Sequence, residues 1–431
     1  MTTSLLLILL LTVLLSGGVW IAVTLGVVAW SGVAFFSNTR PDINLVTSYW
    51  NMYSSLSLAS LPMFIWMGEI LFRTRLAEQM FAGLAPWLDR LPGRLLHVNV
   101  LSCGIFGAVS GSSSATCATI SKIALPELAK RGYDQRMSIG SLCGAATLGI
   151  LIPPSIAMII YAVAADVSIV RMFLAGVVPG ILILLMFSGY IVFWALRHPE
   201  LMPPPSFQTT FWQRVKSTAG LIPVVCLILA VFLSMMLGIA TANEASAFGV
   251  LGALVIAALG GNLSWVNLRD SLTGSLRMSA MIMFILGAAS FLTVAMGFTG
   301  IPRALSEWVV SLQLSPYALM AVLTALYLIL GIALDGVSMI VLTTAVVLPM
   351  VQAAGFDPIW FGIYIIVMIE LAEISPPVGF NLFVLQNMTG QSMMMVARSA
   401  IPFFLIMCVA TVLLIAFPSI ATWLPSYMMG R

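Results

Sequence analysis

The sequence predicts an all-α polytopic membrane protein that is built from two inverted-topology repeats. Composition is the first observation: the 431 residues are 61% hydrophobic and only 8% charged, whereas soluble domains carry about 25% charged residues. Uncharged runs such as 181–196 and 403–418 are the second, because they approach the roughly 20 residues that a helix needs to cross a bilayer. A transmembrane barrel would show short alternating segments instead. The third observation is an internal duplication, described below.

The polar residues argue against several classes of function. A net charge of +3 is too small and too dispersed to indicate a nucleic-acid partner. The five cysteines are odd in number and lie in apolar stretches, which favours small buried hydrophobes over a disulfide framework or a metal site. His97 and His198 flank apolar spans without metal-ligand spacing. Because the sequence offers neither a nucleophile–base pair nor metal ligands, we do not expect an enzyme.

The N-terminal region, 1–57, is expected to form scaffold helices. Its first apolar run, near 4–36, has no basic segment before it and is interrupted at Gly17-Gly18, which predicts a broken membrane helix rather than a cleaved signal. Beyond it we expect a first repeat at 58–196, a cytoplasmic linker at 197–217, connecting scaffold helices at 218–277 and a second repeat at 278–424. Individual helices are predicted near 58–72, 137–165, 172–196, 219–237, 243–260, 278–297, 359–391 and 397–424.

Two regions do not fit simple membrane crossings. Residues 95–130 hold two apolar arms around SGSSSAT (110–116), and residues 316–353 hold two arms around LDGVS (334–338). Full crossings would leave short connecting tips with almost no charge, so we interpret both regions as re-entrant hairpins. Irregular backbone at membrane depth is tolerated only against protein or a water-filled cavity. The tips therefore indicate an internal cavity.

The second half of the chain repeats the first at an offset of 223 residues, the separation of Pro126 and Pro349. Every proline of the first copy between 126 and 179 recurs without a gap, and other positions agree as well. The matched pairs are Pro126 and Pro349, Gly132 and Gly355, Tyr133 and Phe356, Asp134 and Asp357, Pro153-Pro154 and Pro376-Pro377, and Pro179 and Pro402. A fold of two halves is the standard architecture of many secondary transporters.

Charge predicts that the two copies are inverted in the membrane. The loop 130–136 of the first copy contains three basic residues, whereas the equivalent loop 353–360 contains none. Four arginines lie in 73–94, against Arg303 alone in the matching region 298–315. Because cytoplasmic loops are enriched in Lys and Arg, the first loop is expected inside the cell and the second outside.

The paired prolines suggest how membrane helices hold ions here. Pro153-Pro154 and Pro376-Pro377 remove backbone hydrogen bonds, so each break presents free carbonyls, which suit a cation, and free amides, which suit a carboxylate. The tips add further oxygens that suit Na⁺, from Ser110, Ser112, Ser113, Ser114 and Thr116 at the first and from Asp335 and Ser338 at the second. Two such clusters predict two Na⁺ sites with substrate between them.

Plainer roles for the same residues stay open at this point. Serines in membrane segments also pack helices closely or bond back to their own helix. Asp335 lies at a tip and is either a functional acid or a solvated one, although an intramembrane acid is by default a functional-site hypothesis. Glu370 and Glu373 are three residues apart on one helical face near the second break, and of the two Glu373 is preferred as a ligand.

Several separate stretches resemble the large membrane subunit of the tripartite ATP-independent periplasmic (TRAP) transporters of bacteria and archaea. They are GAVSGSSSATCATISKIALPELAKRGYD, GILIPPS, TANEASAFG, LDGVSMIVLTTAVVLP and SPPVGFNLFV. The resemblance covers essentially the whole chain. It implies Na⁺-driven uptake of an organic acid across the bacterial inner membrane by an elevator mechanism, in which hairpins and broken helices form a transport domain that moves against a scaffold. It also implies two partners, a small four-helix membrane subunit and a periplasmic substrate-binding protein.

The resemblance assigns residues to each site and implies no cofactor beyond Na⁺ as the coupling ion. The first Na⁺ site would use Ser110, Ser112, Ser113, Ser114, Gly149 and Pro153. The second would use Asp335, Gly336, Ser338, Glu373 and Pro376. Substrate would contact Ser113, Ser155, Asp335 and Asn381.

Two other classes of protein stay open. A stand-alone dicarboxylate or citrate carrier shares hairpins and inverted repeats but needs no binding protein. A purely structural membrane subunit is disfavoured, because polar tips at membrane depth are costly to maintain without a role. The sequence does not identify which organic acid is carried.

Overall fold

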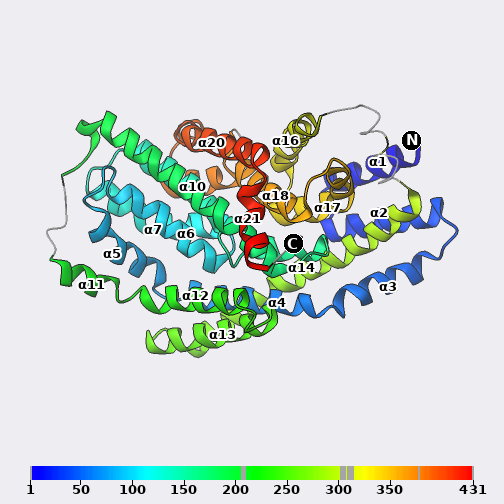
Figure 1. The fold of residues 1–431 in the computed structure, drawn as a ribbon, viewed down its shortest axis with the longest axis horizontal. Helices are drawn as coiled ribbons and strands as arrows, with labels where there is room; N and C mark the ends of the chain where they lie inside the picture. Colours follow the sequence, from blue (N-terminus) through cyan, green and yellow to red (C-terminus); the bar gives the residue numbers. More distant parts are fainter. Residues whose placement is uncertain (1, 205–209, 301–306, 308–314, 377–378, 430–431) are drawn as a thin grey trace.

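The computed structural model describes residues 2–204, 210–300, 307, 315–376 and 379–429, and every regular element within these ranges is helical (Figure 1). The N-terminal helices lie at one end of an elongated bundle, and the helices around residues 76–130 lie at the other. The predicted all-α class is confirmed. Arg303 and Pro377, which entered the charge and proline comparisons, lie outside the described residues.

The first half of the chain contains a run of helices that ends in one long span. These helices are α1 (Thr2–Ser16), α2 (Ile21–Phe36), α3 (Pro41–Tyr53), α4 (Ser60–Phe72), α5 (Leu76–Leu88), α6 (Leu95–Ser110), α7 (Ser113–Lys130), α8 (Gln135–Leu151), α9 (Ile156–Ala164) and α10 (Ile169–Arg197). Short 3-10 turns at Leu56–Ala59 and Pro199–Leu201 precede α4 and follow α10.

The second half of the chain is described from residue 210 onward. Its described helices are α11 (Phe211–Thr218), α12 (Ile222–Met236), α13 (Ala242–Leu259), α14 (Trp265–Thr299), α16 (Pro316–Ala333), α17 (Gly336–Ala353), α18 (Pro358–Glu373), α19 (Phe380–Thr389), α20 (Met393–Ala416) and α21 (Ser419–Met429). By length and apolarity five described helices can cross a bilayer, or eight spans if each bent pair counts as one.

The structure differs from the sequence prediction at several helices. The short helices α3, α5 and α11 were not predicted, because their mixed polar sequences lack a continuous apolar run. Helix α14 begins at Trp265 rather than near 278, since the charged residues of its first turns interrupt the apolar run without breaking the helix. The single helix expected at 397–424 is two helices, because Pro418 ends α20 and α21 begins at the next residue.

Each predicted hairpin is a pair of helices joined by a two-residue tip. Helices α6 and α7 meet at Gly111 and Ser112, where Gly111 has a φ of +59° that a side chain would disfavour. Helices α16 and α17 meet at Leu334 and Asp335. In both hairpins the second tip residue is the N-cap of the second arm.

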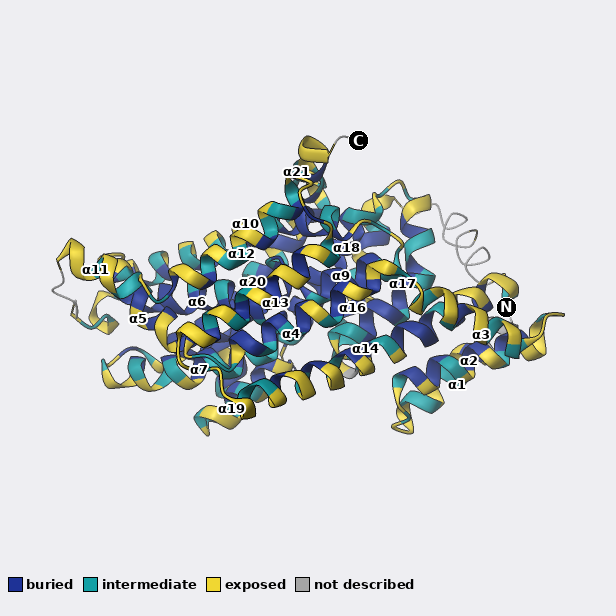
Figure 2. Cartoon of the chain, turned by 90° about the horizontal axis from the view of Figure 1, so that it is seen from below, coloured by how far each residue is buried: buried dark blue, intermediate teal, exposed yellow. Residues whose placement is uncertain are grey.

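Both paired-proline segments break a helix. Helices α8 and α9 are bent by 44° across residues 152–155, and the segment between α18 and α19 contains the exposed Pro376. Helices α8 and α18, which precede the breaks, are almost wholly buried, and α18 lies in the middle of the bundle, which is dark blue in Figure 2.

Equivalent positions at the offset of 223 residues have the same local roles. Asp134 and Asp357 are the N-caps of α8 and α18. Ser112 and Asp335, also 223 apart, are the N-caps of α7 and α17. These shared caps agree with a duplication, while the orientation of each copy in the membrane stays a prediction.

The two halves are packed together reciprocally. Each hairpin packs on the first part of its own half's broken helix: α6 and α7 on α8, and α16 and α17 on α18. The second arms cross over, so that α7 packs on α19 and α17 packs on α9. This exchange brings both tips to one place in the bundle.

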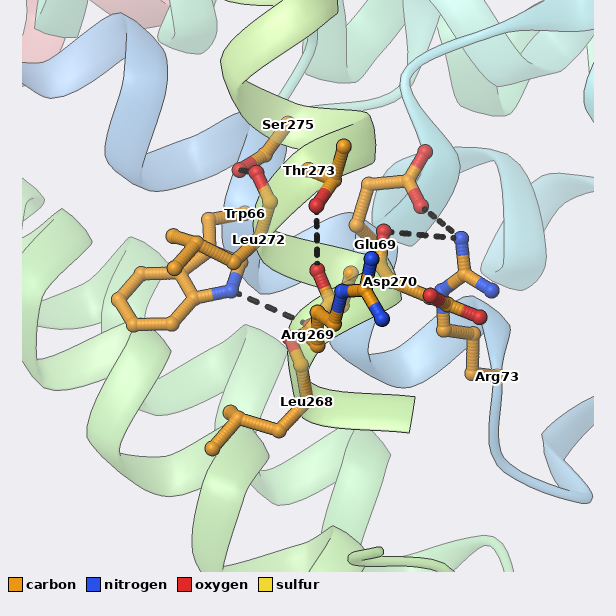
Figure 3. Close-up of polar contacts among 10 residues, drawn as sticks. Trp66, Glu69, Arg73, Leu268, Arg269, Asp270, Leu272, Thr273 and Ser275 are labelled. Atoms are coloured by element: carbon orange, nitrogen blue, oxygen red, sulfur yellow. Dashed lines mark hydrogen bonds and ion pairs between the residues drawn. The ribbon is translucent and has the colours of Figure 1, made fainter. Parts of the chain in front are cut away.

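Helix α14 forms the long wall on the other side of that place and is fixed to α4 by polar contacts (Figure 3). Arg73 Nη2 donates to Glu69 Oε2 and to the Asp270 carbonyl, both at 3.2 Å, and Trp66 Nε1 donates to Ser271 Oγ at 3.3 Å. These hydrogen bonds between α4 and α14 fix the position of one helix relative to the other.

Candidate functional site

One cavity of about 480 Å³ lies where the two hairpin tips meet. Its walls come from the first tip, the second tip, the ends of α8 and α18, the starts of α9 and α19, and one face of α14. The lining residues are Gly111, Ser112, Ser113, Ser114, Ile150, Ile156, Ala157, Met278, Met281, Ile282, Gly331, Ile332, Leu334, Asp335, Gly336, Val337, Met339, Ile369, Ala372, Glu373, Phe380 and Phe383. Both halves of the chain therefore contribute to a single site.

The first tip is held by hydroxyls that bond to its own backbone. The Ser112 carbonyl accepts from Thr116 Oγ1 at 2.8 Å and from Ser110 Oγ at 3.2 Å. Ser110 and Thr116 also share a hydrogen bond of 2.7 Å. Ser112 Oγ accepts from the Ala115 amide as a helix cap. This network orients the tip, so several of the predicted ligand hydroxyls already have protein partners.

The first break lies directly against this tip. A Cβ on Gly149 would be 3.0 Å from Thr116 Oγ1 and 3.5 Å from the Ser112 carbonyl oxygen. Only a glycine allows the end of α8 to approach the tip so closely. The structure thus brings Gly149, Ser112 and the tip hydroxyls together.

Pro153 and Ser155, which were also assigned to the site near the first break, lie elsewhere in the structure. Pro153 lines a separate apolar cavity of about 290 Å³ between α6, α10 and α12. Ser155 is fully buried and donates through Oγ to the Ile150 carbonyl at 2.5 Å, so its hydroxyl satisfies a carbonyl freed by the break. Neither side chain lines the cavity between the tips.

At the second tip, the Asp335 carboxylate binds the start of its own helix. Oδ2 accepts from the amides of Val337 at 3.2 Å and Ser338 at 3.4 Å, and Oδ1 accepts from the Ser338 hydroxyl. A carboxylate in this position is stabilised by the positive end of the helix dipole. Asp335 therefore fixes the geometry of the tip and adds negative charge to the cavity wall.

Two acids on α18 have unpaired oxygens in the described part of the chain. Glu373 lines the cavity, and its Oε2 is buried without a hydrogen-bond partner. Glu370 is fully buried one turn earlier, does not line the cavity, and has no partner for either carboxyl oxygen. The sequence preferred Glu373 over Glu370 as a ligand; of the two only Glu373 lines the cavity, and its role as a Na⁺ ligand stays a prediction.

A hydrogen bond links the two halves at Ser113, which lines the cavity, and Asn381, which does not. Asn381 Nδ2, at the start of α19, donates to Ser113 Oγ, at the start of α7, at 2.8 Å. Ser113 also lies beside the Glu373 carboxyl. Asn381 is fully buried, and its Oδ1 has no partner among the described residues. The structure therefore joins two residues that the sequence assigned to substrate contact.

Sequence reasoning missed the apolar part of the wall. Met278, Met281 and Ile282 of α14, together with Phe380 and Phe383 of α19, line the cavity. Apolar residues in apolar helices give no sequence signal for a binding site. These residues reach the cavity wall only because α14 and α19 pack around the tips.

An all-helical bundle with spans of membrane length, and with two polar tips around one shared cavity, defines a polytopic membrane transport protein. Over residues 8–420 the chain matches the family described as "Tripartite ATP-independent periplasmic transporter, DctM component". The chain belongs to this family. It is therefore a multi-pass protein of the inner membrane, and the relatives of this protein are transport permeases rather than enzymes.

Individual relatives agree over most of the chain. It is 32% identical to the C4-dicarboxylate TRAP transporter large permease protein DctM of Pseudomonas aeruginosa, over 86% of this chain and 87% of that protein. It is 28% identical to the ectoine/5-hydroxyectoine TRAP transporter large permease protein UehC of Ruegeria pomeroyi, over 85% and 86%. The crystal structure of the Alcanivorax borkumensis YdaH transporter has a TM-score of 0.59 at 13% identity, with 87% of each chain covered. That likeness concerns the fold alone.

Proposed function

We propose that this chain is the substrate-translocating subunit of a Na⁺-coupled importer of small organic acids. It works with a small four-helix membrane subunit and a periplasmic binding protein that delivers the substrate. The cavity shared by both hairpin tips is the observation that carries this proposal, because polar residues from both halves, Ser113, Asp335 and Glu373 among them, line it together. Family membership and the named substrates of the relatives support it.

Na⁺ binds where each tip meets the neighbouring break. At the first site the tip oxygens lie beside the end of α8 at Gly149, where the break leaves carbonyls without helical partners. At the second site Asp335 and Ser338 order the tip of α17 near the end of α18. Hard oxygen ligands and half-helix C-terminal ends suit a small cation.

The substrate carboxylate binds between the ions at the start of α7. The amides of the first turn are the positive end of an 18-residue helix and favour an anion. Ser113 and Ser114 line the cavity there and offer hydroxyl donors. Bound Na⁺ adds positive charge to the same place, so carboxylate and ion binding reinforce each other.

Movement of the site past α14 completes the transport cycle. The wall that α14 contributes consists of Met278, Met281 and Ile282, whereas the facing tips are polar. An apolar wall without hydrogen bonds to the tips offers little resistance to sliding. We therefore assign α14, with the helices α2, α3 and α4 on which it packs, to the scaffold and the hairpins with α8, α9, α18 and α19 to the moving domain.

Reconstitution tests the function directly. The chain is placed in proteoliposomes with its small subunit, and the binding protein is added outside with a radiolabelled carboxylate to which it binds. Uptake is expected when Na⁺ is supplied outside, and little uptake with K⁺ instead or without the binding protein. Equal uptake by the chain alone would favour the stand-alone dicarboxylate or citrate carrier.

A further inference from the structure

The charge of the cavity between the tips is unbalanced. Its lining contains two carboxylates, Asp335 and Glu373, and no lysine, arginine or histidine among the described lining residues. The basic residue next to the lining on α14, Arg277, is exposed and is not part of the wall. A substrate therefore meets negative charge here that no protein cation neutralises.

The two carboxylates are not equivalent. The carboxylate oxygens of Asp335 already have hydrogen-bond partners, because they accept from two amides and one hydroxyl of its own helix. Glu373 Oε2 is buried and has no partner in the described residues. The acids near Glu373 are Asp335 and Glu370, which have the same sign. Glu373 is thus the carboxylate with capacity left for a ligand.

Ser113 connects Glu373 to the start of α7. It lies beside the Glu373 carboxyl and begins α7, whose first amides are donors. Its Oγ accepts from Asn381 Nδ2 at 2.8 Å, but Asn381 itself does not line the cavity. An acceptor on Glu373 that has no partner among the described residues and the helix-end donors of α7 therefore lie on either side of Ser113.

We propose that Glu373 makes this cavity selective for carboxylates that also carry a cationic N–H group. In this arrangement the carboxylate of the substrate faces the start of α7, and the cationic nitrogen donates to Glu373 Oε2. The inference rests on the proposed function and specifies the substrate class of the same site. It gives Glu373 to the substrate rather than to the second Na⁺ site, to which the family resemblance assigned it.

The physical basis is a difference between two ligands of similar size. A dicarboxylate brings a second negative group toward Glu373, and close like charges in a partly dehydrated site repel strongly. A zwitterion replaces that repulsion with attraction and also satisfies the Glu373 oxygen that has no partner among the described residues. Many binding sites obtain specificity by repelling one ligand as well as by attracting the other.

The test compares 4-aminobutyrate with succinate, which have four carbons each and differ in one terminal group. The chain with its small subunit is placed in lipid nanodiscs, and binding is followed by thermal stabilisation in NaCl and in KCl. In NaCl the wild-type complex is expected to bind 4-aminobutyrate about tenfold or more tightly than succinate. In Glu373→Gln the preference should fall to about threefold or less, with an unchanged Na⁺ midpoint. Glu373→Asp should restore part of it.

Glu370→Gln is the matched control, since it removes an acid from the same helix at a position outside the lining. It should leave the preference intact. Succinate bound in Na⁺ as tightly as 4-aminobutyrate by the wild type would overturn the inference while leaving the proposed function in place. A raised Na⁺ midpoint in Glu373→Gln with no change in preference would instead make Glu373 an ion ligand and also overturn it. If no carboxylate binds in a Na⁺-dependent way, the proposed function and this inference fail together.

Discussion

Gly107 of α6 and Gly149 of α8 are in direct backbone contact: a Cβ on Gly107 would lie 2.1 Å from the Gly149 Cα. The second half has a matching contact, in which a Cβ on Gly331 of α16 would lie 2.2 Å from the Cβ of Ala372 on α18. Gly149 and Ala372 are 223 residues apart, like the repeat. Close approach of hairpin and broken helix is therefore a shared feature that places each tip against its break.

Gly107→Ala should destabilise the protein and reduce uptake. The added methyl group cannot fit, so α6 must shift from α8, and overpacking of this kind costs about 1–3 kcal/mol. Gly189→Ala on α10 is the matched control, because nothing lies within 4 Å of that Cβ. Thermal unfolding of the purified variants measures the difference. Equal stability of the two variants would show that α6 can shift away from α8 without lowering the free energy of unfolding.

Asp335→Asn should raise the Na⁺ concentration needed for half-maximal uptake by about tenfold or more, equivalent to about 1.4 kcal/mol. Asparagine keeps an acceptor for the cap but removes a charge near the second ion. Asp335→Glu should also be impaired, because an extra methylene displaces the oxygens that accept from Val337 and Ser338.

The matched control for that prediction is Asp357→Asn. Asp357 is also an N-cap that accepts from two amides, at Ile359 and Trp360, but it does not line the cavity. Uptake measured against Na⁺ concentration separates the two positions. An unchanged curve for Asp335→Asn, or the same shift for Asp357→Asn, would remove Asp335 from the ion site.

Loss of the Ser113–Asn381 hydrogen bond should weaken the link between the halves. Ser113→Ala and Asn381→Ala should each lower stability, and the double variant should lose less than the sum, with a coupling of about 1 kcal/mol. Ser114→Ala, which removes the next hydroxyl without touching this bond, is the control. Full additivity in a double-mutant cycle of thermal stability would show that the bond contributes nothing.

Single cysteines at Gln135 and Ala354 should be labelled from opposite sides of the membrane. Both lie at the start or end of loops that the duplication makes equivalent, and the charge contrast predicts inversion. The five native cysteines must first be replaced, because Cys226 is exposed. Impermeant thiol reagents applied to cells and to inverted vesicles give the answer. Labelling of both cysteines from the same side would contradict the prediction of inverted repeats.

Several local features of the site could be predicted from sequence because their physics is local. Pro153-Pro154 lacks the amides that a continuous helix needs, and the break appears at 152–155. The tips at 110–116 and 334–338 were located by polar residues within apolar arms, and both are helix–helix turns. Helices α3, α5 and α11 were missed, since they are short and their apolar runs are interrupted.

Long-range relationships were outside the reach of sequence reasoning. Ser113 and Asn381 are 268 residues apart and bond directly; the family resemblance placed both near substrate, but nothing in either neighbourhood indicates the bond. Pro153 was assigned to an ion site but lines a separate apolar cavity, because the direction of a side chain at a break depends on what packs against it. Met278 and Phe380 are ordinary apolar residues until the packing of α14 and α19 places them in the cavity wall.

By itself, the sequence determined the membrane class, the breaks and the polar tips, and it predicted the duplication. These follow from composition, from missing backbone donors and from the cost of polar groups in hydrocarbon, all of which act within a few residues. Only the tertiary structure decided that both tips share one cavity, that Asp335 is hydrogen-bonded to its own helix, and that one oxygen of Glu373 has no partner among the described residues. Those outcomes depend on how α7 and α17 cross to the opposite half, and the packing of helices hundreds of residues apart is fixed by the complementarity of whole surfaces rather than by any local pattern.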